Sequence, residues 1–225
     1  MRHSIIIPTL NEEQVILNCL NTLQSFRAAG CEIIIGDGGS MDKTRELALP
    51  MVNKWINSEK GRAIQMNAAA NHATGEMLIF LHADTVLPDD AFNLIANSIN
   101  EQQQWGRFDI RLSGKHPLLK IIACCMNWRS RLTGIATGDQ AIFINKRLFE
   151  TIGGYPAIAL MEDIALCKKL IRISPPVCLN AKVISSGRRW EHNGILRTIL
   201  LMWGLRLRYF MGEDPQILAN SYYKD

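Results

Sequence analysis

Short apolar runs alternate with amphipathic stretches over the first ninety residues of this 225-residue chain. The runs have the continuous apolar character of strands that are buried on both faces of a sheet, and the stretches between them repeat apolar residues at helical spacing. The predicted strands are 4–7, 32–35, 52–56 and 77–81, and the predicted helices are 12–29, 43–49 and 63–73. This alternation predicts an α/β fold with a doubly wound, mostly parallel sheet.

The rest of the chain is less regular. We predict helices over 91–100, 118–132, 147–152 and 164–171, and strands over 108–112 and 138–144 and around Val177 and Val183. Residues 195–212 are strongly apolar but contain three arginines, whereas a membrane-spanning helix needs about 20 predominantly apolar residues. We expect one domain over residues 1–190 and a helical extension over 191–225, which packs on the domain, on a partner or on the membrane surface.

Composition and charge narrow the class of protein. A hydrophobic content of 48% is enough for a full core, and the six cysteines show no metal-binding spacing, so we expect them to be small core residues in a reducing compartment. The apolar run at the amino terminus is too short for a signal peptide, which predicts a cytoplasmic protein, either free or at the inner face of the membrane. The net charge of +4, weighted toward the carboxyl half, suits anionic substrates or a membrane surface. Without a nucleic-acid-binding motif, we expect no nucleic acid partner.

Polar residues follow the apolar runs at two predicted strand ends. His82-Ala83-Asp84 comes directly after the run 77–81, and Asp37 lies in a glycine-rich turn after 32–35. In open α/β sheets ligands bind beyond the carboxyl ends of the strands, so these side chains indicate a binding site.

Each candidate also has a purely structural interpretation. Aspartates at strand ends and helix starts are often caps or turn formers, and Asn11 has the features of a helix N-cap. In this interpretation His82 fills a polar gap, Arg189 pairs with a surface carboxylate and Trp190 belongs to the core. The order and spacing of the whole set favour the functional interpretation.

Five segments, in order, carry a family resemblance: SIIIPTLNEE, EIIIGDGGSMDKT, GRAIQMNAAANHATGEMLIFLHADT, FINKRLFETIGGYP and MEDIALCKKL. They lie within residues 4–172 and resemble the family 2 glycosyltransferases with the GT-A fold, and look most like the small bacterial members of the arsenosugar-biosynthesis type. Five ordered segments are far more specific than one short motif. The resemblance implies a mostly parallel central sheet flanked by helices, and a hexosyltransferase-like enzyme that moves a sugar from a nucleotide-sugar donor to an acceptor hydroxyl.

The resemblance also implies roles for individual residues. Asp163, with Glu162 beside it, matches the general base, and direct displacement would invert the anomeric centre. Asp84 matches the last aspartate of the Asp-X-Asp motif that binds a divalent cation. The residues at donor-binding positions are Pro8, Thr9, Asn11, Glu12, Asp37, Gly61, Arg62, Asn67, His82, Ala83, Arg189 and Trp190.

The sequence departs from the family pattern at three positions. Gly36 stands where many relatives have the first of two aspartates, Ser186 stands at the glutamine of Gln-X-X-Arg-Trp, and His82 replaces the first aspartate of Asp-X-Asp. A neutral imidazole can bind Mn²⁺ but suits Mg²⁺ poorly, so the need for either cation stays open. Without a cation, Arg62, His82 and Arg189 would neutralise the leaving group.

Two other functions are compatible with such a sheet. A nucleotidyltransferase that makes nucleotide sugars would need a glycine-rich, basic loop after the first strand, and residues 8–12 are acidic instead. A nucleotide-sugar-binding protein without transferase activity is compatible with His82, and it would bind donor without releasing nucleoside diphosphate. The motifs determine neither the sugar nor the acceptor, and they leave a homo-oligomer open.

Overall fold

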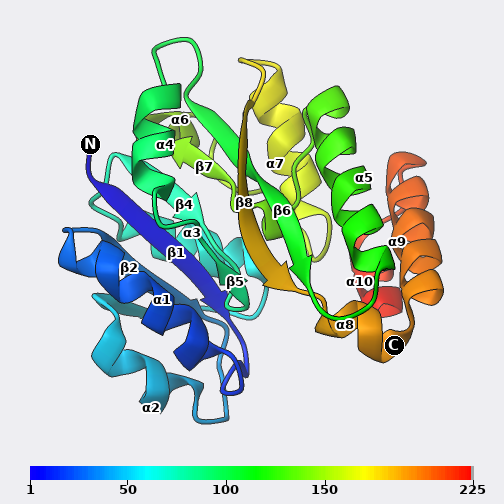
Figure 1. Cartoon of the computed structure of the whole chain (residues 1–225), viewed down its shortest axis with the longest axis horizontal. Coiled ribbons are helices and arrows are strands. Elements are labelled where there is room, and N and C mark those ends of the chain that lie inside the picture. The colour runs from blue at the N-terminus through cyan, green and yellow to red at the C-terminus, as the bar shows by residue number, and fades with distance from the viewer. Residues whose placement is uncertain (224–225) are drawn as a thin grey trace.

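Eight strands form one sheet in residues 1–223, the part of the chain that the computed structural model describes (Figure 1). The strands are β1 (His3–Thr9), β2 (Glu32–Asp37), β3 (Lys54–Asn57), β4 (Met77–Phe80), β5 (Thr85–Val86), β6 (Trp105–Ser113), β7 (Phe143–Asn145) and β8 (Val177–Ser186). Their spatial order is β3-β2-β1-β4-β7-β6-β8-β5. β7 is antiparallel to both of its neighbours and β5 is antiparallel to β8, whereas the other pairs are parallel. The predicted mostly parallel α/β sheet is confirmed.

Helices cover both faces of this sheet. They are α1 (Ile16–Ala28), α2 (Thr44–Ala48), α3 (Arg62–Asn71), α4 (Ala91–Ser98), α5 (Leu118–Thr133), α6 (Lys146–Thr151), α7 (Glu162–Ile171), α8 (Arg188–Asn193), α9 (Ile195–Phe210) and α10 (Pro215–Tyr223), with short 3₁₀ turns η1 (Leu49–Met51) and η2 (Gly138–Gln140). One core lies between the sheet and α1, α4 and α5, and a second lies between the sheet and α3, α6 and α7.

Side-chain alternation explains the unbroken apolar runs of the central strands. In β1, Ile5 and Ile7 belong to the first core and Ile6 belongs to the second. The runs of β2 and β4 divide between the two cores in the same way. Because successive side chains of a strand point to opposite faces, a strand that is covered on both sides needs apolar residues at every position.

Asn11 does not cap the first helix, so that prediction is wrong. α1 begins at Ile16, and Asn11 has a left-handed backbone with φ 55°. Its side-chain oxygen accepts a hydrogen bond from the Met41 N–H at 2.9 Å, and its own N–H donates to Ser40 Oγ at 2.9 Å. Asn11 therefore ties the loop after β1 to the loop after β2.

Two further predictions are wrong. Residues 138–144 are not one strand: the Gln140 side-chain oxygen accepts a hydrogen bond from the Thr137 N–H at 3.2 Å across the η2 turn, and only the short β7 follows. Cys124 and Cys125 are exposed rather than buried, because α5 is apolar on more than the one face that meets the sheet.

The last helices pack at one end of the sheet, beside the start of α7. Leu205 of α9 and Leu218 and Tyr222 of α10 form an apolar cluster with Met161 and Ile164. The predicted boundary between the domain and its extension, after residue 190, falls inside α8. This boundary stays a prediction. No helix within residues 1–223 is long and apolar enough to cross a membrane.

Candidate active site

The loops after β1 and β2 are tied together at the carboxyl edge of the sheet. Thr9 lies beside Asp37 in the strand register, and its Oγ1 donates to the Asp37 carboxylate at 3.2 Å. That carboxylate also accepts hydrogen bonds from Ser40 Oγ and from the backbone N–H groups of Gly39 and Ser40. Four donors use the accepting capacity of one carboxylate, so the geometry favours the structural interpretation of Asp37.

Gly36, beside Pro8 in the register, faces helix α3 at the same edge. An added Cβ at residue 36 would lie 2.3 Å from the backbone oxygen of Gln65. Gln65 Nε2 in turn donates to the carbonyl oxygens of Thr9 and Gly36. The close approach of α3 leaves no room for an aspartate at residue 36, which explains this departure from the family pattern.

His82 meets a carboxylate that the sequence did not indicate. Because β4 and β7 are antiparallel, the residues before β7 lie beside those that follow β4. Asp139, in the η2 turn, therefore reaches His82, and its Oδ1 lies 3.0 Å from His82 Nδ1. On the other side of the ring, a Cβ added at Gly138 would lie 2.4 Å from His82 Nε2, so only glycine fits there.

The pairing of His82 with Asp139 affects the pKa of both groups. Burial, the largest single effect, lowers the pKa of His82, but the bond to Asp139 together with the charges of Asp139 and Asp84 outweighs it, and the net direction is upward. Burial, again the largest single effect, raises the pKa of Asp139, but the bond to His82 together with the charges of His82, Arg62 and Arg189 outweighs it, so the pKa is lowered. Both shifts favour an imidazolium paired with a carboxylate.

Asp84 lies in the same electrostatic neighbourhood. β5 pairs with β8, so Asp84, directly before β5, lies close to the turn that carries Arg188. Burial raises the pKa of Asp84; His82 and Arg188 oppose this effect and Asp139 adds to it. Burial, followed by the charge of Asp84, also raises the pKa of Glu12. Three acidic residues therefore lie close together at this edge of the sheet: Glu12, Asp84 and Asp139.

Asp163 is connected to the same turn. It lies in the first turn of α7, directly after Glu162. Asp163 Oδ2 accepts a hydrogen bond from the Gly138 N–H at 3.1 Å. Glu162 is buried, and burial together with the charge of Asp163 raises its pKa. Two adjacent residues of η2 thus link Asp163 to the His82–Asp139 pair.

Arg62, the first residue of α3, faces these carboxylates directly after Gly61. Burial lowers the pKa of Arg62, but Tyr222 and nearby carboxylates raise it to a larger extent. Tyr222 of α10 is buried, and its ring centroid lies 3.7 Å from the guanidinium carbon of Arg189. Arg189 also donates a hydrogen bond to the Tyr222 hydroxyl. α10 thus covers one side of the site.

Three residues at predicted donor-binding positions are used elsewhere. Asn67 bonds both the N–H and the C=O of Tyr155 through its side-chain amide, and so positions that loop. Ala83 is buried in the first core, and Trp190 packs against it. The geometry therefore favours the structural interpretation of Trp190.

The sequence interpretation missed three residues of this site. Arg188 precedes the Arg-Trp pair and could have been named from that neighbour. Asp139 belongs to none of the motifs, and Tyr222 lies in an extension without motifs. Both reach the site only through long-range packing.

A preformed metal centre is not part of this arrangement. Within residues 1–223, no three His, Cys, Asp or Glu side chains are grouped so as to hold a metal ion. His82 uses Nδ1 for Asp139 and has Nε2 against Gly138, so it does not fit as a ligand. Asp84 remains, and a single carboxylate holds a cation where substrate phosphates and water complete the coordination.

Comparison with known proteins places the chain in a family. Residues 4–120 match the family described as "Glycosyl transferase family 2". A PGL/p-HBAD biosynthesis glycosyltransferase of Mycobacterium bovis is 31% identical over 178 residues, which cover 68% of this chain and 62% of that protein. The structure of S. aureus TarS 1-349 in complex with UDP-GlcNAc has a TM-score of 0.66 at 19% identity, over 83% of this chain and 58% of that one. The mannosyltransferase PcManGT of Pyrobaculum calidifontis, in complex with GDP-Man and Mn²⁺, has a TM-score of 0.63 at 20% identity, over 81% of this chain and 56% of that one.

These likenesses differ in what they establish. The chain spans less than two thirds of the length of each of these proteins. The two structures confirm the GT-A fold that the resemblance implied. The family match covers half of the chain, and the identity to the mycobacterial transferase extends over two thirds of it. The chain therefore belongs to glycosyl transferase family 2.

Proposed function

We propose that this protein transfers a sugar, of the hexosyl type, from a nucleotide-sugar donor to an acceptor hydroxyl with inversion. One observation carries the proposal: the η2 turn joins Asp163 to the His82–Asp139 pair at the ligand-binding edge of the sheet, with Arg62 facing them. Membership of the family, together with the nucleotide-sugar complexes of TarS and PcManGT, supports the class of donor.

The charges of the site suit that reaction. Asp163 accepts the proton of the acceptor hydroxyl as the oxygen attacks the anomeric carbon opposite the leaving group, which inverts that centre. Arg62 and the His82 imidazolium stabilise the negative charge that develops on the departing nucleoside diphosphate. A divalent cation, Mn²⁺ or Mg²⁺, held by Asp84, would add positive charge at the same phosphates.

A ligand panel tests the donor class and the role of Asp84 together. We expect one of the UDP or GDP sugars to raise the melting temperature by about 5–10 °C at a concentration about 100 times its Kd. If Asp84 holds a cation with the donor phosphates, EDTA and Asp84→Asn each reduce the shift, whereas Asp89→Asn, at an exposed aspartate nearby, does not. A shift that survives EDTA would assign charge neutralisation to Arg62 and His82 alone.

Turnover separates transfer from binding alone. The donor that binds should be consumed with release of nucleoside diphosphate, slowly in water and faster with an acceptor. Binding without any release would contradict the transferase and support a silent binding protein. A panel in which no nucleotide shifts the melting temperature would contradict the donor class.

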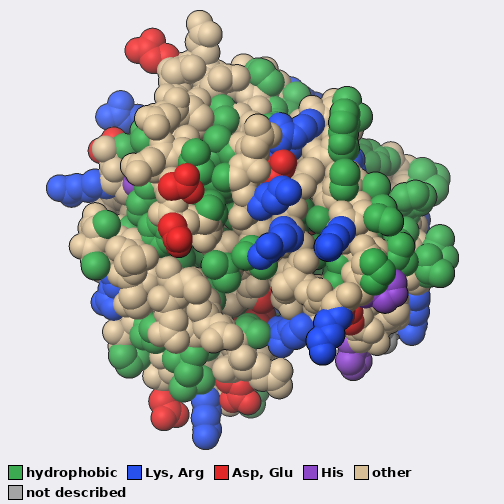
Figure 2. Space-filling model, viewed as in Figure 1, with side chains coloured by type: hydrophobic (Ala, Val, Ile, Leu, Met, Phe, Trp, Pro, Cys, Tyr) green, Lys and Arg blue, Asp and Glu red, His purple; other side chains and the backbone are tan. Residues whose placement is uncertain are grey.

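We also propose that the protein rests on an anionic membrane surface through an apolar face formed by α5 and α9. We call this the α5–α9 face; its residues are Ile121, Trp128, Leu132, Leu196, Leu200, Trp203 and Leu207, each more than half exposed. The α9 members recur at helical spacing, and Figure 2 shows hydrophobic side chains gathering over the two helices. Lys115, His116 and Arg197 line the hollow between the starts of the helices, together with the acidic Glu191. Apolar stripes with tryptophan and a basic border are typical of helices at anionic lipid interfaces.

Sedimentation with phosphatidylglycerol vesicles tests this contact. We expect the double substitution Leu200→Glu with Trp203→Glu to weaken binding at least about tenfold, because charged groups replace two apolar anchors. Leu17→Glu, at an exposed leucine of α1, serves as the control. Equal partitioning of all forms would contradict the proposal. Light scattering provides a second test. If the wild type is a dimer and the double variant is a monomer, the face is a subunit interface and the proposal is contradicted.

A further inference from the structure

Helices α5 and α9 run side by side (Figure 1), and each carries an arginine whose charge bears on this region: the charge of Arg206 lowers the pKa of Arg129. Arg129 extends from α5 and Arg206 from α9. Nε and Nη2 of Arg129 and Nε of Arg206 are buried, and they have no hydrogen-bond partner among residues 1–223. A guanidinium presents its N–H donors in a fixed fork, so these atoms are positively charged donors whose hydrogen-bonding capacity is unused.

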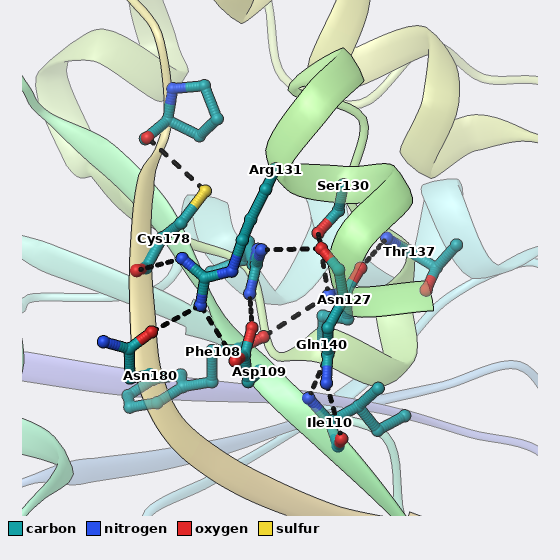
Figure 3. A network of polar contacts seen from close by, with 12 residues as sticks. Phe108, Asp109, Ile110, Asn127, Ser130, Arg131, Thr137, Gln140, Cys178 and Asn180 are labelled. Atoms are coloured by element: carbon teal, nitrogen blue, oxygen red, sulfur yellow. Dashed lines mark hydrogen bonds and ion pairs between the residues drawn. The ribbon is translucent and has the colours of Figure 1, made fainter. Parts of the chain in front are cut away.

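Neighbouring carboxylates do not satisfy this pair. Asp109 is the acidic residue of the adjacent polar network, and its two oxygens already bind Arg107 and Arg131 (Figure 3). The pKa of Arg129 is lowered to about 10, first by burial and then by repulsion from Arg206. Burial also lowers the pKa of Arg206. Buried cations are normally paired, so two that repel each other indicate a missing anion.

The pair lies at the Asp163 end of the site. Asp163 is the acidic group whose attraction is felt by both Arg129 and Arg206. Its carboxylate already accepts hydrogen bonds from backbone N–H groups, and neither guanidinium makes an ion pair with it within residues 1–223. Arg62 and Arg188 form a second group of cations, which faces Asp84. The site therefore has positive charge on more than one side: Arg129 and Arg206 near Asp163, and Arg62 and Arg188 near Asp84, with Asp139 close to both Arg62 and Arg206.

We propose that Arg129 and Arg206 bind an anionic group of the acceptor, a phosphate or a carboxylate, and so place the acceptor hydroxyl beside Asp163. This inference rests on the proposed transferase function and adds the chemical class of its acceptor. Planar guanidinium groups bind phosphate and carboxylate oxygens through two parallel hydrogen bonds, which fixes orientation as well as position. The leaving diphosphate of the donor belongs to the other positive region, with Arg62 and Arg188.

Inorganic phosphate is the probe that tests the pair in the full-length protein. Its binding is measured by calorimetry at constant ionic strength, alone and after saturation with UDP or GDP and Mn²⁺. We expect Arg129→Gln and Arg206→Gln each to weaken phosphate binding about tenfold or more, and Arg111→Gln, at an exposed arginine of β6, to leave it unchanged. Phosphate should still bind when the nucleotide is present.

The melting temperature is a second measurement, and it distinguishes a ligand-binding arginine from a purely structural one. In buffer without phosphate, Arg129→Gln should melt at the same temperature as the wild type or higher, because it removes a buried charge that has no partner. A clear loss of melting temperature in Arg129→Gln would overturn the inference in favour of a structural role.

The binding outcomes separate this inference from the proposed function. Phosphate binding that is equal in the wild type and both glutamine variants, while a nucleotide binds, overturns the acceptor site alone. Displacement of phosphate by the nucleotide assigns the pair to the donor diphosphate and also overturns it. A protein that binds no nucleotide overturns the proposed function itself.

Discussion

Replacing Asp163 by asparagine is expected to lower the rate of sugar transfer by about 10²- to 10⁴-fold, the range that a positioned general base contributes. The asparagine oxygen can still accept the hydrogen bond from the Gly138 N–H, and only the bond from the Ile164 N–H to the other carboxylate oxygen is lost, so the η2 turn should persist. Donor binding should change by less than about twofold, because a general base acts in the transition state rather than in the bound ground state. The rate of nucleoside diphosphate release with acceptor present, and the donor melting shift, measure the two effects.

Glu162→Gln is the matched control for this substitution. Burial and the charge of Asp163 raise the pKa of Glu162, so its carboxyl is biased toward the neutral form that glutamine imitates. We therefore expect this variant to lose less than about tenfold in transfer rate. A larger loss in Glu162→Gln than in Asp163→Asn would show that the base is not Asp163.

The part of the fold that periodicity predicts is the part built from parallel strands. β1, β2 and β4 are covered on both faces, so they are apolar at every position and stand out in the sequence. β7 has only three residues, which is too short for a periodic signal. Its antiparallel direction follows from pairing with β4 and β6, which no local pattern reports.

The site residues divide in the same way. His82, Asp84 and Asp163 could be named from the sequence because they follow a strand or open a helix within recognisable motifs. Asp139 could not, because it reaches His82 only through the pairing of β4 with β7. Trp190 illustrates the reverse case: its motif position implied ligand contact, whereas in the structure it is partly buried against the first core, and its predicted contact with the donor stays a prediction.

Asp109→Ala is expected to lower the free energy of unfolding by about 3–5 kcal/mol, the loss typical of a buried ion pair that is broken on one side. Arg107 is completely buried, and it donates to Asp109, which follows two residues later on the same face of β6. Without the carboxylate, Arg107 would keep its charge in the core, with the carbonyl oxygen of Asn127 as a remaining acceptor. Urea unfolding, followed by tryptophan fluorescence, measures the change.

Asp109 also contributes to the contact between β6 and α5. β7 pairs with β6 at Trp105 and Gly106. Beyond Gly106, α5 covers the edge of β6 along which β7 would otherwise continue. The Asn127 amide bonds both backbone groups of Ile110 there, and Asp109 accepts a hydrogen bond from Arg131 at 2.8 Å (Figure 3). Asp109 therefore holds α5, the helix that carries Arg129, against the sheet.

Two comparison variants determine whether the loss comes from the unpaired charge. Glu150→Ala breaks a surface pair with Lys146, in which Glu150 is 59% exposed, and should cost less than about 0.5 kcal/mol. The double substitution Arg107→Met with Asp109→Leu should recover most of the stability lost in Asp109→Ala, because it removes the buried cation together with its partner. If Asp109→Ala costs no more than Glu150→Ala, or if the double substitution recovers nothing, the buried pair is not what holds α5 to the sheet.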